Sequence, residues 1–153
     1  MKSHIPIKTR LAELLSWISI IALMMACPTT DAAQEPRVML TSGFGFEDVV
    51  IGTGSTADLG DVVTVHLQGW LNHNGGKGRK YFSTTDDGQP ISFKLGTERV
   101  MPAWNQGVEG MAVGGIRRLW VPASLGYGSK GVSDVVPPDT DLIFEIELLA
   151  IRR

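Results

Sequence analysis

One segment, residues 96–114, constrains the fold more than any other, because it holds the only convincing helix that the sequence predicts beyond residue 33. Pro102 suits the first turn of a helix, where its fixed φ is already helical and its missing N–H needs no partner. Trp104, Val108 and Met111 then fall at i, i+4 and i+7, on one face of that helix.

A helix of this composition needs a sheet to pack against. Gly107 and Gly110 each weaken it by about 1 kcal/mol relative to alanine, so tertiary packing must hold it. Other stretches alternate apolar and polar residues, which is typical of half-buried strands. They are residues 46–51, 62–71, 91–95, 116–122 and 142–151. The sequence therefore predicts an α+β fold in which an antiparallel sheet wraps around one short helix.

Two segments outside these strands are predicted to be irregular. Residues 33–45 are mixed in character and contain Pro36, so we interpret them as a linker. Residues 72–80 (NHNGGKGRK) are rich in glycine and basic residues, which favours an exposed, mobile loop. The folded domain is accordingly expected over residues 46–153.

The first 32 residues resemble an export signal. Basic residues precede an apolar run at 14–26 that is too short to span a bilayer comfortably. Small residues at 30–33 offer an ordinary cleavage site, whereas the sequence MMAC ending at Cys27 is similar to a bacterial lipobox and makes Cys27 a candidate for lipidation. An uncleaved anchor is a third alternative. We expect an exported protein, either periplasmic or attached to the membrane as a lipoprotein.

Composition excludes several classes of function. The formal net charge is −2 and the basic residues are scattered, so nucleic acid is not an expected partner. His66 and His73 show no metal-ligand spacing, and the only cysteine is Cys27, so we expect no metal, cofactor, disulfide or thiol nucleophile. Ser124 is not in a G-x-S-x-G motif, which disfavours a hydrolase triad. Large apolar and aromatic side chains are what the domain offers a ligand.

Short motifs spread along the domain carry a family resemblance. In chain order they are Val65–Gly69 (VHLQG), Phe82–Thr84 (FST), Gly88–Phe93 (GQPISF), Leu95–Gly96, Val100–Val108 (VMPAWNQGV), Met111–Gly114 (MAVG), Tyr127–Gly128, Val136–Pro138 (VPP) and Leu142–Leu149 (LIFEIELL). Each motif is weak alone, but their common order makes residues 46–153 resemble the FKBP family of peptidyl-prolyl cis/trans isomerases.

The resemblance implies a five- to six-stranded antiparallel half-barrel around the helix, with an apolar pocket between them that catalyses rotation about X-Pro bonds. The catalytic residues that it implies are Trp104 as floor, Phe82 and Phe144 as walls, and Tyr127 at the rim. The substrate-binding residues that it implies are Leu67, Ser83, Ile91, Phe93, Val100, Met101 and Val136. Proline-containing polypeptides are the implied partners of a protein that we expect to be a monomer.

This sequence departs from the family pattern at the pocket. Leu67 stands where tyrosine is usual, and Ser83 stands where an aspartate usually follows the wall phenylalanine. The long segment 72–80 also allows the alignment to slip by one residue, which would make Tyr81 the wall. Because two polar groups are lost, we expect retained isomerase activity and weaker binding of macrolide inhibitors. A proline-peptide binding module or holdase without catalysis is the alternative function.

Overall fold

The computed structural model describes residues 37–153 of the 153-residue chain. The predicted signal peptide, its cleavage sites and Cys27 lie outside the described residues. The description that follows concerns the compact unit that ends at Arg153.

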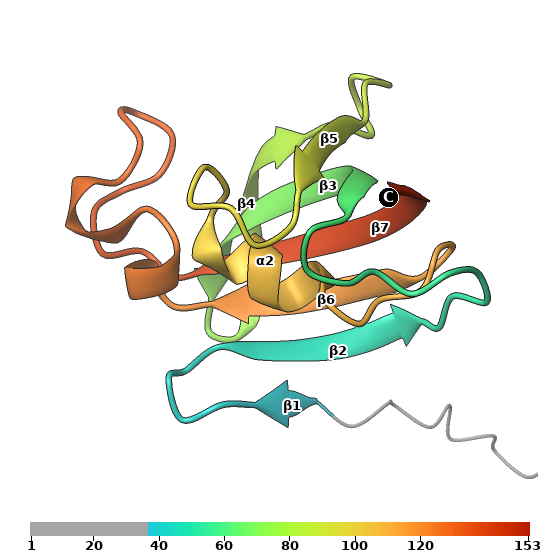
Figure 1. The fold of residues 1–153 in the computed structure, drawn as a ribbon. Coiled ribbons are helices and arrows are strands. Elements are labelled where there is room, and N and C mark those ends of the chain that lie inside the picture. The colour runs from blue at the N-terminus through green and yellow to red at the C-terminus, as the bar shows by residue number, and fades with distance from the viewer. Residues whose placement is uncertain (1–36) are drawn as a thin grey trace, which may run out of the picture. The chain divides into compact units, whose positions relative to one another are not determined.

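The described residues form one antiparallel sheet and one short α-helix (Figure 1). The strands are β1 (Val38–Met39), β2 (Gly45–Val50), β3 (Val62–His73), β4 (Gly76–Ser83), β5 (Ile91–Lys94), β6 (Ile116–Val121) and β7 (Leu142–Arg152). The helix is α2 (Pro102–Val108), and η2 (Ala123–Leu125) and η3 (Gly128–Lys130) are 3₁₀ turns. The strand order is β1-β2-β6-β7-β3-β4, with β5 also paired to β3. The predicted α+β architecture is confirmed, with seven strands instead of five or six.

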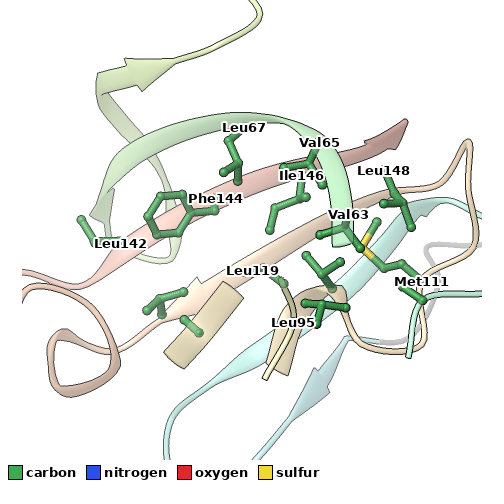
Figure 2. Close-up of a cluster of buried hydrophobic side chains, with 14 of the residues drawn as sticks. Val63, Val65, Leu67, Leu95, Met111, Leu119, Leu142, Phe144, Ile146 and Leu148 are labelled. Atoms are coloured by element: carbon green, nitrogen blue, oxygen red, sulfur yellow. The ribbon is translucent and has the colours of Figure 1, made fainter. Parts of the chain in front are cut away.

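The core lies between α2 and one face of the sheet, and alternation along the two central strands builds it. Val63, Val65 and Leu67 of β3 are fully buried, and their neighbours in sequence point to the other face. Figure 2 shows these side chains together with the buried residues of β7. Those are Leu142, Phe144, Ile146 and Leu148, each with an exposed fraction of 0%. The predicted half-buried alternation of both strands is confirmed.

The helix is shorter than its sequence pattern suggested. It starts at Pro102, with Met101 as N-cap, and ends at Val108. Met111 is buried as predicted, but it follows the helix in a turn that its N–H closes by donating to the Val108 carbonyl at 3.0 Å. Gly107 is required here because a Cβ at this position would collide with the Leu119 side chain of β6. The absence of a side chain thus lets the helix approach the sheet.

Arg117 of β6 joins the end of α2 to the sheet. Its guanidinium is buried and donates to both carboxylate oxygens of Asp48 on β2, at 2.6 and 3.0 Å. It also donates to the carbonyls of Gly107 and Glu109, at 3.1 and 3.2 Å. A cation at this place satisfies carbonyls that the helix leaves without a partner.

The predicted loop at residues 72–80 is wrong. Its first two residues extend β3, and its last five begin β4, so that only Asn74 and Gly75 form the turn. Both have positive φ, 52° and 83°, which defines a tight two-residue hairpin. The Gly75 carbonyl accepts from the Trp120 indole N–H at 2.9 Å, which fastens the hairpin to the outer face of the sheet.

The predicted linker at residues 33–45 is also wrong over its described part. β1 pairs with β2, and Phe44 is 1% exposed within the main core. Burying a phenylalanine contributes roughly 1.5–3 kcal/mol. The folded unit therefore begins before Phe46.

Candidate functional site

An aromatic cluster at the mouth of the core is the candidate site. Trp104 is half-buried on the first turns of α2, where its backbone N–H donates to the Met101 carbonyl at 2.9 Å. Its ring lies 5.6 Å from that of Phe144 at 89° and 6.0 Å from that of Phe93 at 34°. The edge-to-face contact with Phe144 stabilises this aromatic pair beyond the area that it buries. The helix, β5 and β7 therefore converge on the Trp104 indole.

The cluster continues on the other side of Phe144. The Tyr81 ring of β4 lies 6.3 Å from the Phe144 ring and 6.2 Å from the Tyr127 ring, with interplanar angles of 73° and 75°. Tyr127 caps the η3 turn and brings the long loop before β7 to the same place. Five aromatic rings from separate segments thus form one continuous cluster.

The loop before α2 is fastened by a side chain of the helix itself. Asn105 accepts from the Gly96 N–H at 3.0 Å and donates to the Thr97 carbonyl at 3.1 Å. These two bonds fix the path of the chain into the helix. Val100 and Met101, both half-buried, follow directly on this path.

A cleft opens beside the aromatic cluster. Its cavity volume is about 610 Å³. It is lined by Phe93, Lys94, Thr97, Glu98, Arg99 and Val100. Phe93 and Val100 are predicted substrate-binding residues, and Phe93 contacts Trp104, so the cleft adjoins the cluster. The sequence analysis did not predict the four other lining residues, although their position shortly before the helix could have indicated that they border the site.

The prediction of Phe82 as a pocket wall is wrong. Phe82 is 37% exposed, whereas Tyr81 contacts Phe144, as the one-residue slip of the alignment would require. The cause is a β-bulge: Gly69 pairs with Phe82 and Trp70 pairs with Lys80, so Tyr81 has no directly opposed residue. A bulge of this kind redirects a side chain, which simple alternation cannot anticipate.

Two further predicted residues lie in the core, and a third lies at the end of β4, near Tyr81. Leu67 and Val136 are 0% and 2% exposed and belong to the main core, as Phe144 does, but neither is part of the aromatic cluster. Ser83 accepts from the Asp86 N–H at 3.1 Å and stabilises the turn after β4. Ile91, by contrast, is half-buried and packs against the core beside the aromatic residues.

Two polar atoms are sealed inside the cluster. The Tyr81 hydroxyl and the Trp104 Nε1 are buried without a hydrogen-bond partner among the residues that the structure describes. Burial raises the pKa of Tyr81 far above its usual range, and the neighbouring Tyr127 raises it further. The phenol is therefore neutral and can donate a hydrogen bond, but it cannot act as a base at physiological pH.

Groups for other chemistry are scarce in the described part of the chain. Within residues 37–153 no three His, Cys, Asp or Glu side chains gather as metal ligands. Over the same residues, no helix has the length and apolar character needed to cross a membrane. His66 lies on the face opposite the cluster, with Nδ1 3.1 Å from the Thr84 hydroxyl. What the site offers is an apolar surface with two hydrogen-bond donors.

Comparisons with known proteins agree with this geometry. A family model described as FKBP-type peptidyl-prolyl cis-trans isomerase matches residues 54–149. The FK506-binding protein of Neisseria meningitidis serogroup A is 42% identical over 105 residues, which are 69% of this chain and 93% of that protein. The peptidyl-prolyl cis-trans isomerase FPR2 of Saccharomyces cerevisiae is 45% identical over 93 residues, covering 61% of this chain and 67% of that protein.

A solved structure shares the fold. The crystal structure of AtFKBP13 superimposes with a TM-score of 0.68 and 31% sequence identity, covering 76% of this chain and 99% of that one. The antiparallel sheet, the helix α2 packed on it and the match of the family model to residues 54–149 agree with one another. The chain belongs to the FKBP-type peptidyl-prolyl cis-trans isomerase family.

Proposed function

We propose that this isomerase binds the proline ring of its substrate on the aromatic cluster, with Trp104 as floor, Phe144 and Tyr81 as walls and Tyr127 at the rim. The observation that carries the proposal is the convergence of five aromatic rings beside a cleft of about 610 Å³. Ligand sites are typically concave and mostly apolar, with a few polar groups that fix orientation.

A site of this kind suits a reaction in which no bond is broken. Rotation about a peptide bond meets a barrier of about 18–20 kcal/mol because of its partial double-bond character. The planar amide is more dipolar than the twisted one, so an apolar environment disfavours the ground state relative to the transition state. Isomerisation of X-Pro bonds in water takes tens to hundreds of seconds, so a catalyst can increase its rate substantially.

Positioning supplies the other part of the proposed mechanism. Tyr127 donates to a carbonyl of the bound peptide, and the backbone at Val100 and Met101 holds the chain at the start of α2. Ile91 and Phe93 extend the apolar surface from β5. Fixing the peptide in this way orders the reacting bond without acid or base catalysis.

The proposed biological role is to assist folding of exported proteins. It rests on the sequence of residues 1–32, with a basic start, an apolar run and two processing alternatives. Proline-containing chains in the periplasm or at the membrane surface are the proposed substrates. Incorporation of labelled fatty acid that is lost in Cys27→Ser supports the lipoprotein form, and a processed chain that starts near residue 33 contradicts it.

Weaker binding of macrolide inhibitors is part of the same proposal. Leu67 is apolar, and since Tyr81 is the wall residue, the side chain after the wall is Phe82. Both polar groups that the family pattern usually has here are then missing. Titration with a macrolide inhibitor is expected to show tighter binding to Phe82→Asp than to the wild type, and equal affinity contradicts the proposal.

The rate of isomerisation tests the site. We expect Phe144→Leu to lower kcat/KM for blocked Ala-Xaa-Pro-Phe peptides by about tenfold or more, a loss of about 1.4 kcal/mol of transition-state stabilisation. Tyr127→Phe should lose less, because it keeps the ring.

Trp70→Phe is the matched control for this experiment. Trp70 is 8% exposed in the separate cluster on the outer face of the sheet, so its truncation perturbs packing without touching the site. Equal loss of activity in the Trp70 and Phe144 variants, with both proteins folded, would place the catalytic surface elsewhere.

A further inference from the structure

The Tyr81 hydroxyl and the Trp104 indole N–H are the polar atoms that the fold of residues 37–153 leaves unexplained. Both are sealed from solvent, and neither makes a hydrogen bond of normal geometry among the described residues. The Tyr127 side chain interacts with the Tyr81 phenol and helps to raise its pKa, but no well-formed hydrogen bond joins the two hydroxyls. Buried polar atoms almost always have a partner, because an unmade hydrogen bond costs free energy. Their occurrence as a pair in one aromatic cluster indicates that the missing acceptor comes with a ligand.

Several features of the chain place the Tyr81 ring. The β-bulge leaves Tyr81 without an opposed residue in β3, so its side chain does not follow the regular alternation of β4. Gly69 supplies the space for the ring, since a Cβ there would lie 3.0 Å from the Tyr81 ring and 3.1 Å from that of Phe144. Tyr127 contacts the ring from the other side. The phenol is thus held in place before any ligand arrives.

The chemistry of the two atoms defines the group that they accept. An indole N–H only donates, and the buried phenol stays protonated because burial raises its pKa. A neutral carbonyl suits two donors in an apolar site better than a carboxylate does, since burying an unpaired charge is far more costly. A peptide bound through its proline carries such carbonyls on both sides of the ring.

We propose that Tyr81 is a positioning residue whose hydroxyl donates a hydrogen bond to a backbone carbonyl of the bound proline peptide. The Trp104 N–H acts as a second donor, since the Trp104 and Tyr81 rings both pack against Phe144. The inference rests on the proposed location of the isomerase site. It adds a polar determinant on β4 to a site whose other polar rim group, Tyr127, lies on the loop before β7.

Tyr81→Phe in the full chain tests this proposal. The change keeps the ring and removes only the hydroxyl. The KM for a blocked Ala-Leu-Pro-Phe peptide, and its dissociation constant by titration, should rise about 3- to 10-fold, as expected for a lost neutral hydrogen bond. kcat should change less than KM. The melting temperature of the free protein should stay the same or rise, because an unpaired buried hydroxyl is removed.

Thr64→Val is the control for loss of a hydroxyl. Thr64 is on the opposite face of β3, where its hydroxyl lies 2.8 Å from that of Ser92. The peptide affinity of the Thr64→Val variant should equal that of the wild type. Unchanged peptide affinity in Tyr81→Phe overturns the inference, and so does a lower melting temperature, which would reveal a partner inside the fold. A wild-type protein that neither binds nor isomerises the peptide overturns the proposed function itself.

Discussion

Gly69 decides whether the aromatic cluster can form. It lies on β3 beneath the rings of Tyr81 and Phe144, and a Cβ would be 3.0–3.1 Å from both. Contacts this close require one ring to move, and overpacking of this kind typically costs about 1–3 kcal/mol. A single missing side chain thus lets two wall residues meet.

Gly69→Ala is therefore predicted to lower both stability and catalysis. We expect a loss of about 1–3 kcal/mol in the free energy of unfolding, measured in urea, and a lower kcat/KM because Tyr81 is displaced. Gly76→Ala is the matched control, since its Cβ would meet nothing closer than the His73 carbonyl at 3.5 Å. If the two variants have equal unfolding free energies and equal kcat/KM values, a methyl group fits beneath the rings and the prediction is wrong.

The short helix depends on an arginine from a neighbouring strand. α2 has seven residues and no side-chain N-cap, so little in its own sequence holds it. Arg117 ties its C-terminal carbonyls to Asp48 of β2 through four hydrogen bonds. Because Trp104 is on this helix, the clamp also positions the floor of the site.

Arg117→Met is predicted to destabilise the protein by about 1–3 kcal/mol, because it leaves the partly exposed Asp48 without its cation and the helix-end carbonyls without a donor. The adjacent Arg118→Met should cost about 1 kcal/mol or less, since Arg118 pairs with Glu145 on the outer face with 29% of its side chain exposed. Chemical unfolding of the two variants checks this. Similar losses would mean that the helix does not rely on the clamp.

Across the molecule, the outer face of the sheet carries an ionic network around Glu145 of β7. Its carboxylate accepts from Lys77 of β4 at 2.8 Å and from Arg118 of β6 at 3.0 Å. Burial by itself would raise the Glu145 pKa, but the hydrogen bonds and charges of Lys77 and Arg118 outweigh it and hold the pKa below the ordinary 4.5. The network connects strands from three separate parts of the chain.

The pH dependence of stability should report this network. A carboxylate whose folded pKa is depressed stabilises the fold above its unfolded pKa, and that contribution is lost as the pH falls through the folded pKa. The wild type should exceed Glu145→Gln in unfolding free energy at pH 7 by less than about 1 kcal/mol, because the pair is partly exposed. The gap should close below pH 4.5. A gap that persists unchanged at pH 3 contradicts this assignment.

Local patterns predicted most of the architecture. Alternation along residues 62–71 and 142–151 predicted half-buried strands, and Pro102 marked the first turn of the helix, because both signals depend only on near neighbours in the chain. The hairpin at Asn74 and Gly75 was also readable, since this dipeptide favours a two-residue turn. The glycine-rich and basic residues around this dipeptide led instead to the prediction of a loop over residues 72–80.

The details of the site depended on contacts between distant segments. Tyr81 replaces Phe82 as the wall because a bulge shifts the register of β4 against β3, and Val136 is buried because its loop folds back onto the core. Neither event leaves a periodic mark in the sequence.

The sequence by itself determined the fold class, the family and most residues of the aromatic cluster, because these follow from side-chain periodicity and from motifs in a fixed order. Only the tertiary structure decided which aromatic residue of β4 faces Phe144. It also showed that the Tyr81 hydroxyl and the Trp104 indole N–H are buried without a well-placed acceptor within residues 37–153. The physical reason is that register and hydrogen-bond satisfaction arise between strands and loops far apart in the chain, where no local pattern records them.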